Sequence, residues 1–275
     1  MAADFKDRVA VVTGGTQGLG EAIATVFAER GARGVVIAGR NPERGAAVAK
    51  RLSGLGAEAI FVPAELARVE DCRAVLAKTR ETFGVVHHLV NAAGTSKRGT
   101  IVDTSPELFD EIMAINVRAP FFLMQEAVRL MIETGTEGTI VNILSTAIHT
   151  GAPFLSPYAT SKGALANLTR NTAFALVRNR IRANGLAIGW MDTPGEDTIQ
   201  KTAHGAADGW LAAAEARQPF GRLLKPDEVA RAVAFLSSTE SGMMTGAIVD
   251  FDQTVLGGWE SQPYPAAAMT LPAGG

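Results

Sequence analysis

The stretch TGGTQGLGEA, Thr13 to Ala22, lies between an apolar run and a segment with helical periodicity. The apolar run, Val9-Ala10-Val11-Val12, is typical of a buried parallel strand. The segment from Glu21 to Arg30 repeats apolar residues at helical spacing and is followed by Gly31, a common residue at the end of a helix. Glycines between a strand and a helix let the backbone approach an anion, which the helix N-terminus then binds. The stretch therefore predicts a phosphate cradle.

The alternation of strand and helix continues along the chain. Strands are predicted at residues 9–12, 34–38, 58–62, 88–91, 138–143, 181–187 and 247–251. Helices are predicted at residues 21–30, 41–52, 69–82, from 105 onward, 117–132, 158–178 and 226–236. Strands that alternate with helices imply right-handed crossovers. We therefore expect an α/β fold, a Rossmann-type doubly wound parallel sheet of about seven strands with helices on both faces.

We expect residues 1–256 to form a single domain, because an α/β domain of this size buries a large core without a second one. A segment without clear periodicity, residues 194–221, is predicted to be an irregular lid beside the site. Residues 257–275 form a C-terminal tail rich in proline, alanine and glycine.

Composition restricts the class of protein. The 275 residues carry a net charge of −2, which gives no electrostatic signature for nucleic acid or an anionic membrane. One cysteine, Cys72, excludes an internal disulfide framework and indicates a reducing compartment. The first residues, MAADFKDR, have no apolar signal core, and no uncharged apolar stretch of about 18 residues occurs. We therefore expect a cytoplasmic protein with no nucleic-acid or membrane partner.

Two common nucleotide-binding patterns do not fit the glycine-rich stretch. A G-x-G-x-x-G fingerprint that starts at Gly18 needs a glycine where Ile23 stands, and no Gly-Lys-Ser/Thr ends the loop as in a P-loop. The pattern that fits is T-G-x-x-x-G-x-G. Two further motifs follow it: Asn91-Ala92-Ala93-Gly94 after a predicted strand, and Ser145 thirteen residues before Y-x-x-x-K at Tyr158 to Lys162.

In this order, the motifs resemble those of the short-chain dehydrogenase/reductase family, and the resemblance extends from about Asp7 to Phe251. The extended relatives, which include sugar epimerases and dehydratases, carry T-G-x-x-G-x-x-G. That spacing would put Gln17 where a glycine is needed. The resemblance therefore favours an oxidoreductase over an epimerase or dehydratase.

Tyr158 and Lys162 lie four residues apart in a helical pattern and project from one face. A neighbouring ammonium and a positively charged nicotinamide favour the phenolate, and a drop of about three units from the usual tyrosine pKa near 10 corresponds to about 4 kcal/mol. The resemblance implies that Tyr158 exchanges a proton with the substrate oxygen and that Ser145 binds the same oxygen. It also implies that Lys162 lowers the pKa of Tyr158 and holds the nicotinamide ribose. Asn116 would hold a water that relays protons towards Lys162.

The end of the second predicted strand, Ala38-Gly39-Arg40-Asn41, bears on the choice of cofactor. A carboxylate there would bind the ribose 2′-hydroxyl of NAD, but this chain has none and carries an arginine. Arginine stays charged and binds phosphate bidentately, so we expect NADP(H), with NAD(H) as the alternative. The residues that the resemblance assigns to cofactor binding are Thr13, Gly14, Gln17, Gly18, Leu19, Gly20, Arg40, Glu65, Leu66, Asn91, Ala92, Gly94, Tyr158, Lys162, Ile188, Met191 and Thr193.

Five residues at four sites depart from the family pattern. Gln17 stands where many NADP-using relatives carry a basic residue, and Glu65 replaces an aspartate that contacts the adenine. Ile188 replaces a proline whose fixed φ would stiffen its turn, and Asp252-Gln253-Thr254 replaces Asp-Gly-Gly.

Three side chains are predicted to contact the substrate: His149, Trp190 and Asp197. They suit a small hydroxylated compound such as a polyol, sugar or sugar acid. No His/Cys/Asp cluster has metal-ligand spacing, so we expect no metal. The predicted reaction interconverts a secondary alcohol and a ketone by hydride transfer. A 3-oxoacyl-thioester reductase and a non-catalytic, cofactor-binding regulator of the same fold are the alternatives.

The predicted helix 158–178 is apolar on more than one face, so part of it needs a partner besides the sheet. Relatives pair this helix and the one that carries Asn116 across a dimer, and two dimers form a tetramer. We therefore expect a homotetramer. The tail has aromatic residues between prolines, which favours docking across an interface.

Overall fold

The sheet has seven parallel strands in the order β3-β2-β1-β4-β5-β6-β7. The computed structural model describes residues 4–149 and 152–255. The strands are β1 (Val9–Thr13), β2 (Gly34–Gly39), β3 (Glu58–Pro63), β4 (His88–Asn91), β5 (Thr139–Ser145), β6 (Arg182–Ile188) and β7 (Ile248–Phe251). The predicted parallel α/β sheet is confirmed, and each predicted strand is present within one or two residues at either end.

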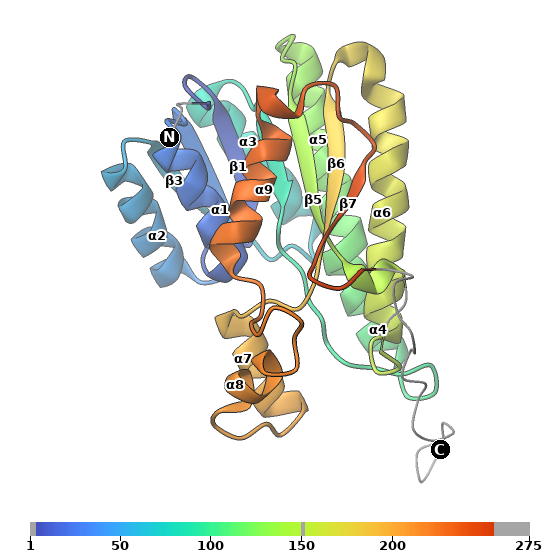
Figure 1. Ribbon diagram of the computed structural model, residues 1–275. Coiled ribbons are helices and arrows are strands. Elements are labelled where there is room, and N and C mark those ends of the chain that lie inside the picture. Colours follow the sequence, from blue (N-terminus) through green and yellow to red (C-terminus); the bar gives the residue numbers. More distant parts are fainter. Residues whose placement is uncertain (1–3, 150–151, 256–275) are drawn as a thin grey trace.

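Helices cover both faces of the sheet (Figure 1). One face carries α1 (Gly18–Glu29), α2 (Pro42–Gly54) and α9 (Pro226–Ser237). The other carries α3 (Val69–Phe83), α5 (Ala119–Glu133) and α6 (Ser156–Leu176). A shorter helix, α4 (Pro106–Met113), leads through a π-helical turn, Ala114–Arg118, into α5. This layering explains why the central strands are apolar on both sides.

The two core layers use alternate residues of the same strand, because successive side chains of a strand point to opposite faces. In β1, Ala10 and Val12 pack with α1 and α9, whereas Val9 and Val11 pack on the side of α3 and α5. All four side chains are fully buried. The residue spacing of β1 therefore determines which helices it contacts.

The segment 194–221 contains two helices, α7 (Pro194–Ala203) and α8 (Trp210–Glu215), and is not irregular as expected. Residues at its own N-terminus stabilise the start of α7. Thr193 Oγ1 caps the helix by accepting a hydrogen bond from the backbone N–H of Glu196 at 3.1 Å, and Pro194 occupies the first turn. The indole rings of Trp190 and Trp210 stack with their centres 6.1 Å apart. This tertiary contact was not visible in the sequence pattern.

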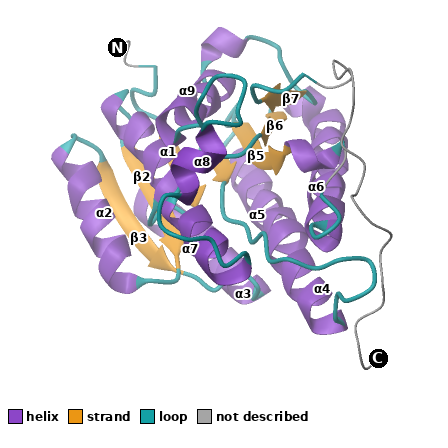
Figure 2. Ribbon diagram, turned by 60° about the horizontal axis from the view of Figure 1, so that its bottom comes forward, coloured by secondary structure: helices purple, strands orange, loops and turns teal. Residues whose placement is uncertain are grey.

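The strands end at one edge of the sheet, called the carboxyl edge here, and α7 and α8 lie beyond it (Figures 1 and 2). The strand register pairs Thr13 with Asn91 and Ser145 with Ile188 at this edge. Residues predicted to bind cofactor and substrate are thereby brought together, as is common in open α/β sheets. Within the described residues, no helix is long and apolar enough to span a membrane. The tail 257–275 lies outside the described residues.

Candidate active site

The glycine-rich turn lets two backbone segments approach each other closely. Gly14 has a φ of 68°, in the region that favours glycine. A Cβ on Gly20 would lie 2.3 Å from the carbonyl oxygen of Gly14, so that position accepts no side chain. Gln17, at the start of α1, gives its helix no side-chain cap. The first N–H groups of α1 are thus left to other acceptors, which fits a cofactor phosphate.

Thr13 and Asn91, two of the predicted cofactor residues, have side-chain partners inside the protein. Thr13 Oγ1 accepts hydrogen bonds from the backbone N–H groups of Ala92 and Ala93, each at 3.1 Å. Asn91 is buried, and its Nδ2 donates to Asn142 Oδ1 at 2.8 Å. Both side chains hold the end of β4 against its neighbours, and the buried Asn91 Oδ1 has no hydrogen-bond partner among the described residues.

Ser145 ends β5, and Tyr158 lies in the first turn of α6, near enough to Ser145 for that hydroxyl to lower the pKa of Tyr158. Lys162, one turn further along α6, is buried and has its Nζ 5.8 Å from the centre of the Tyr158 ring. The Lys162 ammonium donates to the carbonyl oxygen of Ile143 at 2.7 Å. The three side chains predicted to act together do lie together.

Burial shifts the pKa values of Tyr158 and Lys162 in opposite directions. Burial raises the pKa of Tyr158 above its usual value, and this effect exceeds the opposing hydrogen bond from Ser145. Burial also lowers the pKa of Lys162 to about 8. The lowering of the Tyr158 pKa by Lys162 together with a bound nicotinamide stays a prediction. The sequence could not supply the degree of burial.

Asn116 lies in the π-helical turn before α5, with every polar atom of its side chain engaged. Its Oδ1 accepts from the backbone N–H of Thr95, and its Nδ2 donates to the Thr95 carbonyl and to Ser161 Oγ, all at 2.9 Å. A Cβ on Gly94 would lie 3.3 Å from Asn116 Oδ1 and 3.5 Å from Lys162 Nζ. Asn116 thus joins the loop after β4 to α6 beside the Lys162 ammonium. The proposed water relay remains a prediction.

The residues predicted to bind the adenosine end lie on the rim of the site. Arg40 is 77 % exposed, with its Nη1 3.9 Å from Glu65 Oε2, a loose pair that leaves the guanidinium accessible. Arg44 in α2, which sequence reasoning missed, hydrogen-bonds to the side chain of Gln17 across the glycine-rich turn. Its position one helical turn after Arg40 was the available signal. Leu66 is buried beside Glu65.

The residues predicted to bind the nicotinamide end lie after β6. Ile188 ends that strand, and Met191 pairs with Leu224. Thr193 lies beside the glycine-rich turn, since a Cβ on Gly18 would be 3.8 Å from its side chain. The dinucleotide cradle and this segment therefore meet at Gly18.

The polar side-chain atoms of the three predicted substrate residues have partners inside the protein, and their contact with a substrate stays a prediction. His149 Nε2 is 2.8 Å from Asp250 Oδ1 of β7. Trp190 Nε1 donates to Glu196 Oε1, and Asp197 Oδ1 accepts from Trp210 Nε1, each at 2.8 Å. Trp190, before α7, and Asp197, within α7, therefore use their polar atoms in contacts that hold α7 and α8. The sequence placed them near the site but could not show where their polar atoms point.

Two charged side chains that were not predicted to contact the substrate lie close enough to act on Tyr158. The positive charge of Arg98 lowers the pKa of Tyr158, and the negative charge of Glu196 raises it by less. Arg98 follows the Asn91-Ala92-Ala93-Gly94 motif by four residues, and that proximity was the signal in the sequence.

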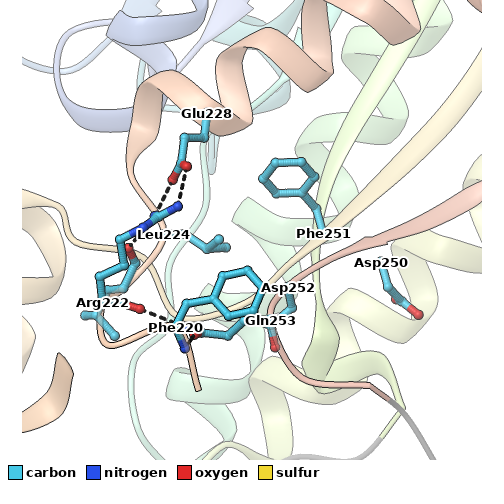
Figure 3. A pocket seen from close by; sticks show the side chains of 9 residues that line it. Phe220, Arg222, Leu224, Glu228, Asp250, Phe251, Asp252 and Gln253 are labelled. Atoms are coloured by element: carbon cyan, nitrogen blue, oxygen red, sulfur yellow. Dashed lines mark hydrogen bonds and ion pairs between the residues drawn. The ribbon is translucent and has the colours of Figure 1, made fainter. Parts of the chain in front are cut away.

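The departure at Asp252-Gln253-Thr254 has a structural role. Gln253 Nε2 donates to the carbonyl of Arg222 at 2.8 Å, and Gln253 Oε1 accepts from the backbone N–H of Phe220 at 2.8 Å. Arg222 in turn pairs bidentately with Glu228 (Figure 3). These contacts line a pocket of about 210 Å³ and tie the end of the lid segment to the residues after β7. A glycine at position 253 could make neither side-chain bond.

Comparison with known proteins agrees with this geometry. A family model described as enoyl-(acyl carrier protein) reductase matches residues 14–254. A (−)-isopiperitenol/(−)-carveol dehydrogenase of Mentha piperita is 33 % identical, covering 95 % of this chain and 96 % of that protein. A gluconate 5-dehydrogenase of Gluconobacter oxydans is 35 % identical, covering 88 % of this chain and 92 % of that protein. A solved short chain dehydrogenase/reductase family protein superimposes with a TM-score of 0.77 at 33 % identity, over 91 % of this chain and 97 % of that one. The chain therefore belongs to the short-chain dehydrogenase/reductase family of NAD(P)-dependent oxidoreductases.

Proposed function

We propose that the protein uses NADP(H) to interconvert a secondary alcohol and a ketone on a small hydroxylated compound, of the polyol, sugar or sugar-acid class. The observation that carries this proposal is the closeness of the Tyr158 and Ser145 side chains beside the buried ammonium of Lys162. A substrate oxygen that binds both hydroxyls can exchange a proton with Tyr158 while Ser145 holds its position.

Each of the four proposed catalytic residues has a distinct task. Tyr158 carries the proton, and Ser145 orients the substrate oxygen. Lys162 binds the ribose, and its pKa of about 8 lets it take up or release a proton near neutral pH. Asn116 keeps the loop after β4 against α6 through Thr95 and Ser161. The bound dinucleotide supplies the hydride acceptor or donor.

A screen of secondary alcohols, polyols, sugar acids and ketones with NADP(H) and NAD(H), followed at the nicotinamide absorbance, tests the function. We expect turnover of at least one compound and a higher kcat/KM with NADP(H). Activity with 3-oxoacyl thioesters alone would favour the alternative function, a 3-oxoacyl-thioester reductase. Cofactor binding without turnover of any compound would favour a regulator.

Tyr158→Phe is expected to lower kcat by about 10²–10⁴-fold, because general acid–base catalysis is lost. The glycine-rich turn stays intact in this variant, so fluorescence titration should show unchanged cofactor affinity. A kcat above about a tenth of the wild-type value would contradict the proton-transfer role.

The preference for NADP(H) is supported by the accessible guanidinium of Arg40 and by Arg44 on the same rim. Arg40→Ser should raise KM for NADP(H) about 10- to 100-fold through loss of a charge-assisted contact and leave KM for NAD(H) nearly unchanged. Arg51→Ser, at the far end of α2, is the control. A wild-type enzyme that is already faster with NAD(H) would overturn the assignment.

We also propose a homotetramer in the cytoplasm. Apolar side chains with more than 40 % exposure lie on α5 and α6: Phe121, Ile132 and Phe174. A second copy that covers them would remove this apolar area from water.

A further inference from the structure

Arg98 lies in the loop between β4 and α4, and backbone pairing holds that loop against the start of α6. The N–H of Gly99 donates to the carbonyl of Phe154 at 2.9 Å, and the N–H of Ser156 donates to the carbonyl of Gly99 at 3.1 Å. Tyr158 follows two residues after Ser156. The backbone therefore fixes Arg98 beside the catalytic tyrosine.

Neighbouring side chains orient the guanidinium group of Arg98. Its Nε donates to His204 Nε2 at 3.0 Å, and its Nη1 donates to the carbonyl of Ser96 at 3.0 Å. The guanidinium carbon lies 5.4 Å from the centre of the Phe154 ring, which also meets the His204 ring edge to face. Only 18 % of the Arg98 side chain is exposed. Arg98 is therefore held in place by contacts with three different segments.

Part of this guanidinium lacks a hydrogen-bond acceptor. Arg98 Nη2 is 3.8 Å from Glu196 Oε1, which is beyond hydrogen-bond length. That oxygen already accepts from Trp190 Nε1 at 2.8 Å and from Gln200 Nε2 at 2.7 Å. Among residues 4–149 and 152–255, Nη2 makes no hydrogen bond. Glu196 offsets part of the Arg98 charge but takes no hydrogen bond from Nη2, so these N–H groups can still bind the carboxylate of a ligand.

The charge of Arg98 reaches the reaction centre. Arg98 lowers the pKa of Tyr158 by more than Glu196 raises it, so the electrostatic potential that the pair creates at the tyrosine hydroxyl is positive. A ligand bound between Arg98 and Tyr158 can therefore carry a negative charge near the reacting oxygen.

We propose that Arg98 binds a carboxylate of the substrate, so that the substrate is a hydroxy acid and the product its oxo acid. This proposal rests on the proposed function and narrows its substrate class. The carboxylate takes the N–H groups of Nη2 and Nη1 while the hydroxyl to be oxidised lies on Tyr158 and Ser145. Of the two named relatives, the printed substrate of one carries a carboxylate and that of the other does not, so the comparisons leave the charge open.

The test compares compounds that differ only in charge: gluconate with gluconamide, 3-hydroxybutyrate with its amide, and cis-4-hydroxycyclohexanecarboxylate with its amide. The wild-type enzyme with NADP⁺ should show a kcat/KM about 10- to 100-fold higher for the acid of a pair, as expected for charge-assisted binding. Arg98→Met should remove this preference and leave turnover of the amide in place, and Arg98→Lys should restore part of it. Lys97→Met is the matched control, since Lys97 is the neighbouring cation and pairs with Glu111 instead.

Binding is measured separately by calorimetric titration of the same acids and amides into the NADP⁺ complex of the Tyr158→Phe variant, with and without Arg98→Met. Tighter binding of the acids that depends on Arg98 supports the proposal even where turnover is slow. Equal affinity for acid and amide, or a preference that survives Arg98→Met in a variant whose melting temperature is unchanged, overturns it. Equal turnover of the amides and acids would overturn the carboxylate site and leave the proposed function intact. Acid-selective binding without any turnover would support the carboxylate site and overturn the proposed function.

Discussion

At the scale of single residues, Lys162 holds a charge where water has little access. Only 5 % of the residue is exposed, and its ammonium has the carbonyl of Ile143 as its hydrogen-bond acceptor. Burial lowers its pKa from 10.5 to about 8. The folded protein therefore binds this proton less tightly than the unfolded chain does, and stability depends on pH.

The pH dependence has a defined sign. Below pH 8, Lys162 is protonated in both the folded and the unfolded state, and burial of its charge destabilises the folded state fully. Between pH 8 and 10.5 the folded state loses the proton first, so this destabilisation disappears as pH rises. The wild-type free energy of unfolding should rise by about 2 kcal/mol between pH 7 and pH 9.5 relative to Lys162→Met. Urea unfolding at fixed protein concentration measures this, with Lys78→Met on the exposed side of α3 as the control. A difference that does not change with pH would contradict the burial of the charge.

Cys72 provides a second residue-scale prediction. The residue has 0 % exposure, and desolvation is the main cause that raises its pKa to about 11. Because the thiolate is the nucleophile, a fraction of only about 10⁻³ is reactive at pH 8. The native protein should react slowly with a chromogenic disulfide reagent, and the unfolded protein should release one equivalent promptly. Full reaction of the native protein within minutes would show that α3 opens readily.

At the scale of elements, the turn between β1 and α1 requires glycine for packing as well as for phosphate. A Cβ on Gly20 would collide with the backbone at Gly14, whereas a Cβ on Gly54, the last residue of α2, would meet nothing within 4 Å. Both glycines lie in helices, where alanine is intrinsically favoured by about 1 kcal/mol. The two positions therefore separate steric strain from helix propensity.

Gly20→Ala should destabilise the protein by about 1–3 kcal/mol and weaken cofactor binding, because a rigid backbone atom must move. Gly54→Ala should stabilise it by about 0.5–1 kcal/mol, because the unfolded chain loses conformational freedom. Chemical unfolding of both variants measures the difference. A Gly20→Ala protein as stable as Gly54→Ala would mean that the turn relaxes without cost.

The lid segment shows how an element can depend on distant partners. Trp190 comes before α7, and Trp210 begins α8; both indole N–H groups donate to carboxylates of α7, namely Glu196 and Asp197. Short helices are marginal in water, so these tertiary contacts stabilise α7 and α8. This is the reason that periodicity alone did not reveal them.

At the scale of the whole molecule, the exposed apolar residues on α5 and α6 bear on assembly. Phe174 is 84 % exposed on α6, and Leu55 is 42 % exposed at the end of α2, on the opposite face of the sheet. Phe174→Asp should reduce the mass measured by light scattering, because a charge would be buried in an interface between copies. Leu55→Asp should leave the mass unchanged. An unchanged mass for Phe174→Asp would exclude this face as the interface, and the docking of tail residues 257–275 remains a separate prediction outside the described residues.

The sequence by itself determined the sheet and the cluster of Ser145, Tyr158 and Lys162. Apolar runs of β1, β4 and β5 alternate with helical periodicity, and the spacing of Ser145, Tyr158 and Lys162 is local to one strand end and one helix turn. Such features depend on the spacing of apolar residues and on residues that are close in sequence, and both can be read from the sequence alone. The same holds for Arg40, which directly follows β2.

Only the tertiary structure decided what surrounds that cluster. It directed Trp190 and Asp197 into the lid segment, paired His149 with Asp250, and brought Arg98 beside Tyr158. It also buried the Tyr158 side chain, which raises its pKa, because the amount of water around a side chain depends on every element packed against it. Side-chain direction and burial arise from contacts between residues far apart in sequence, and no local pattern encodes them.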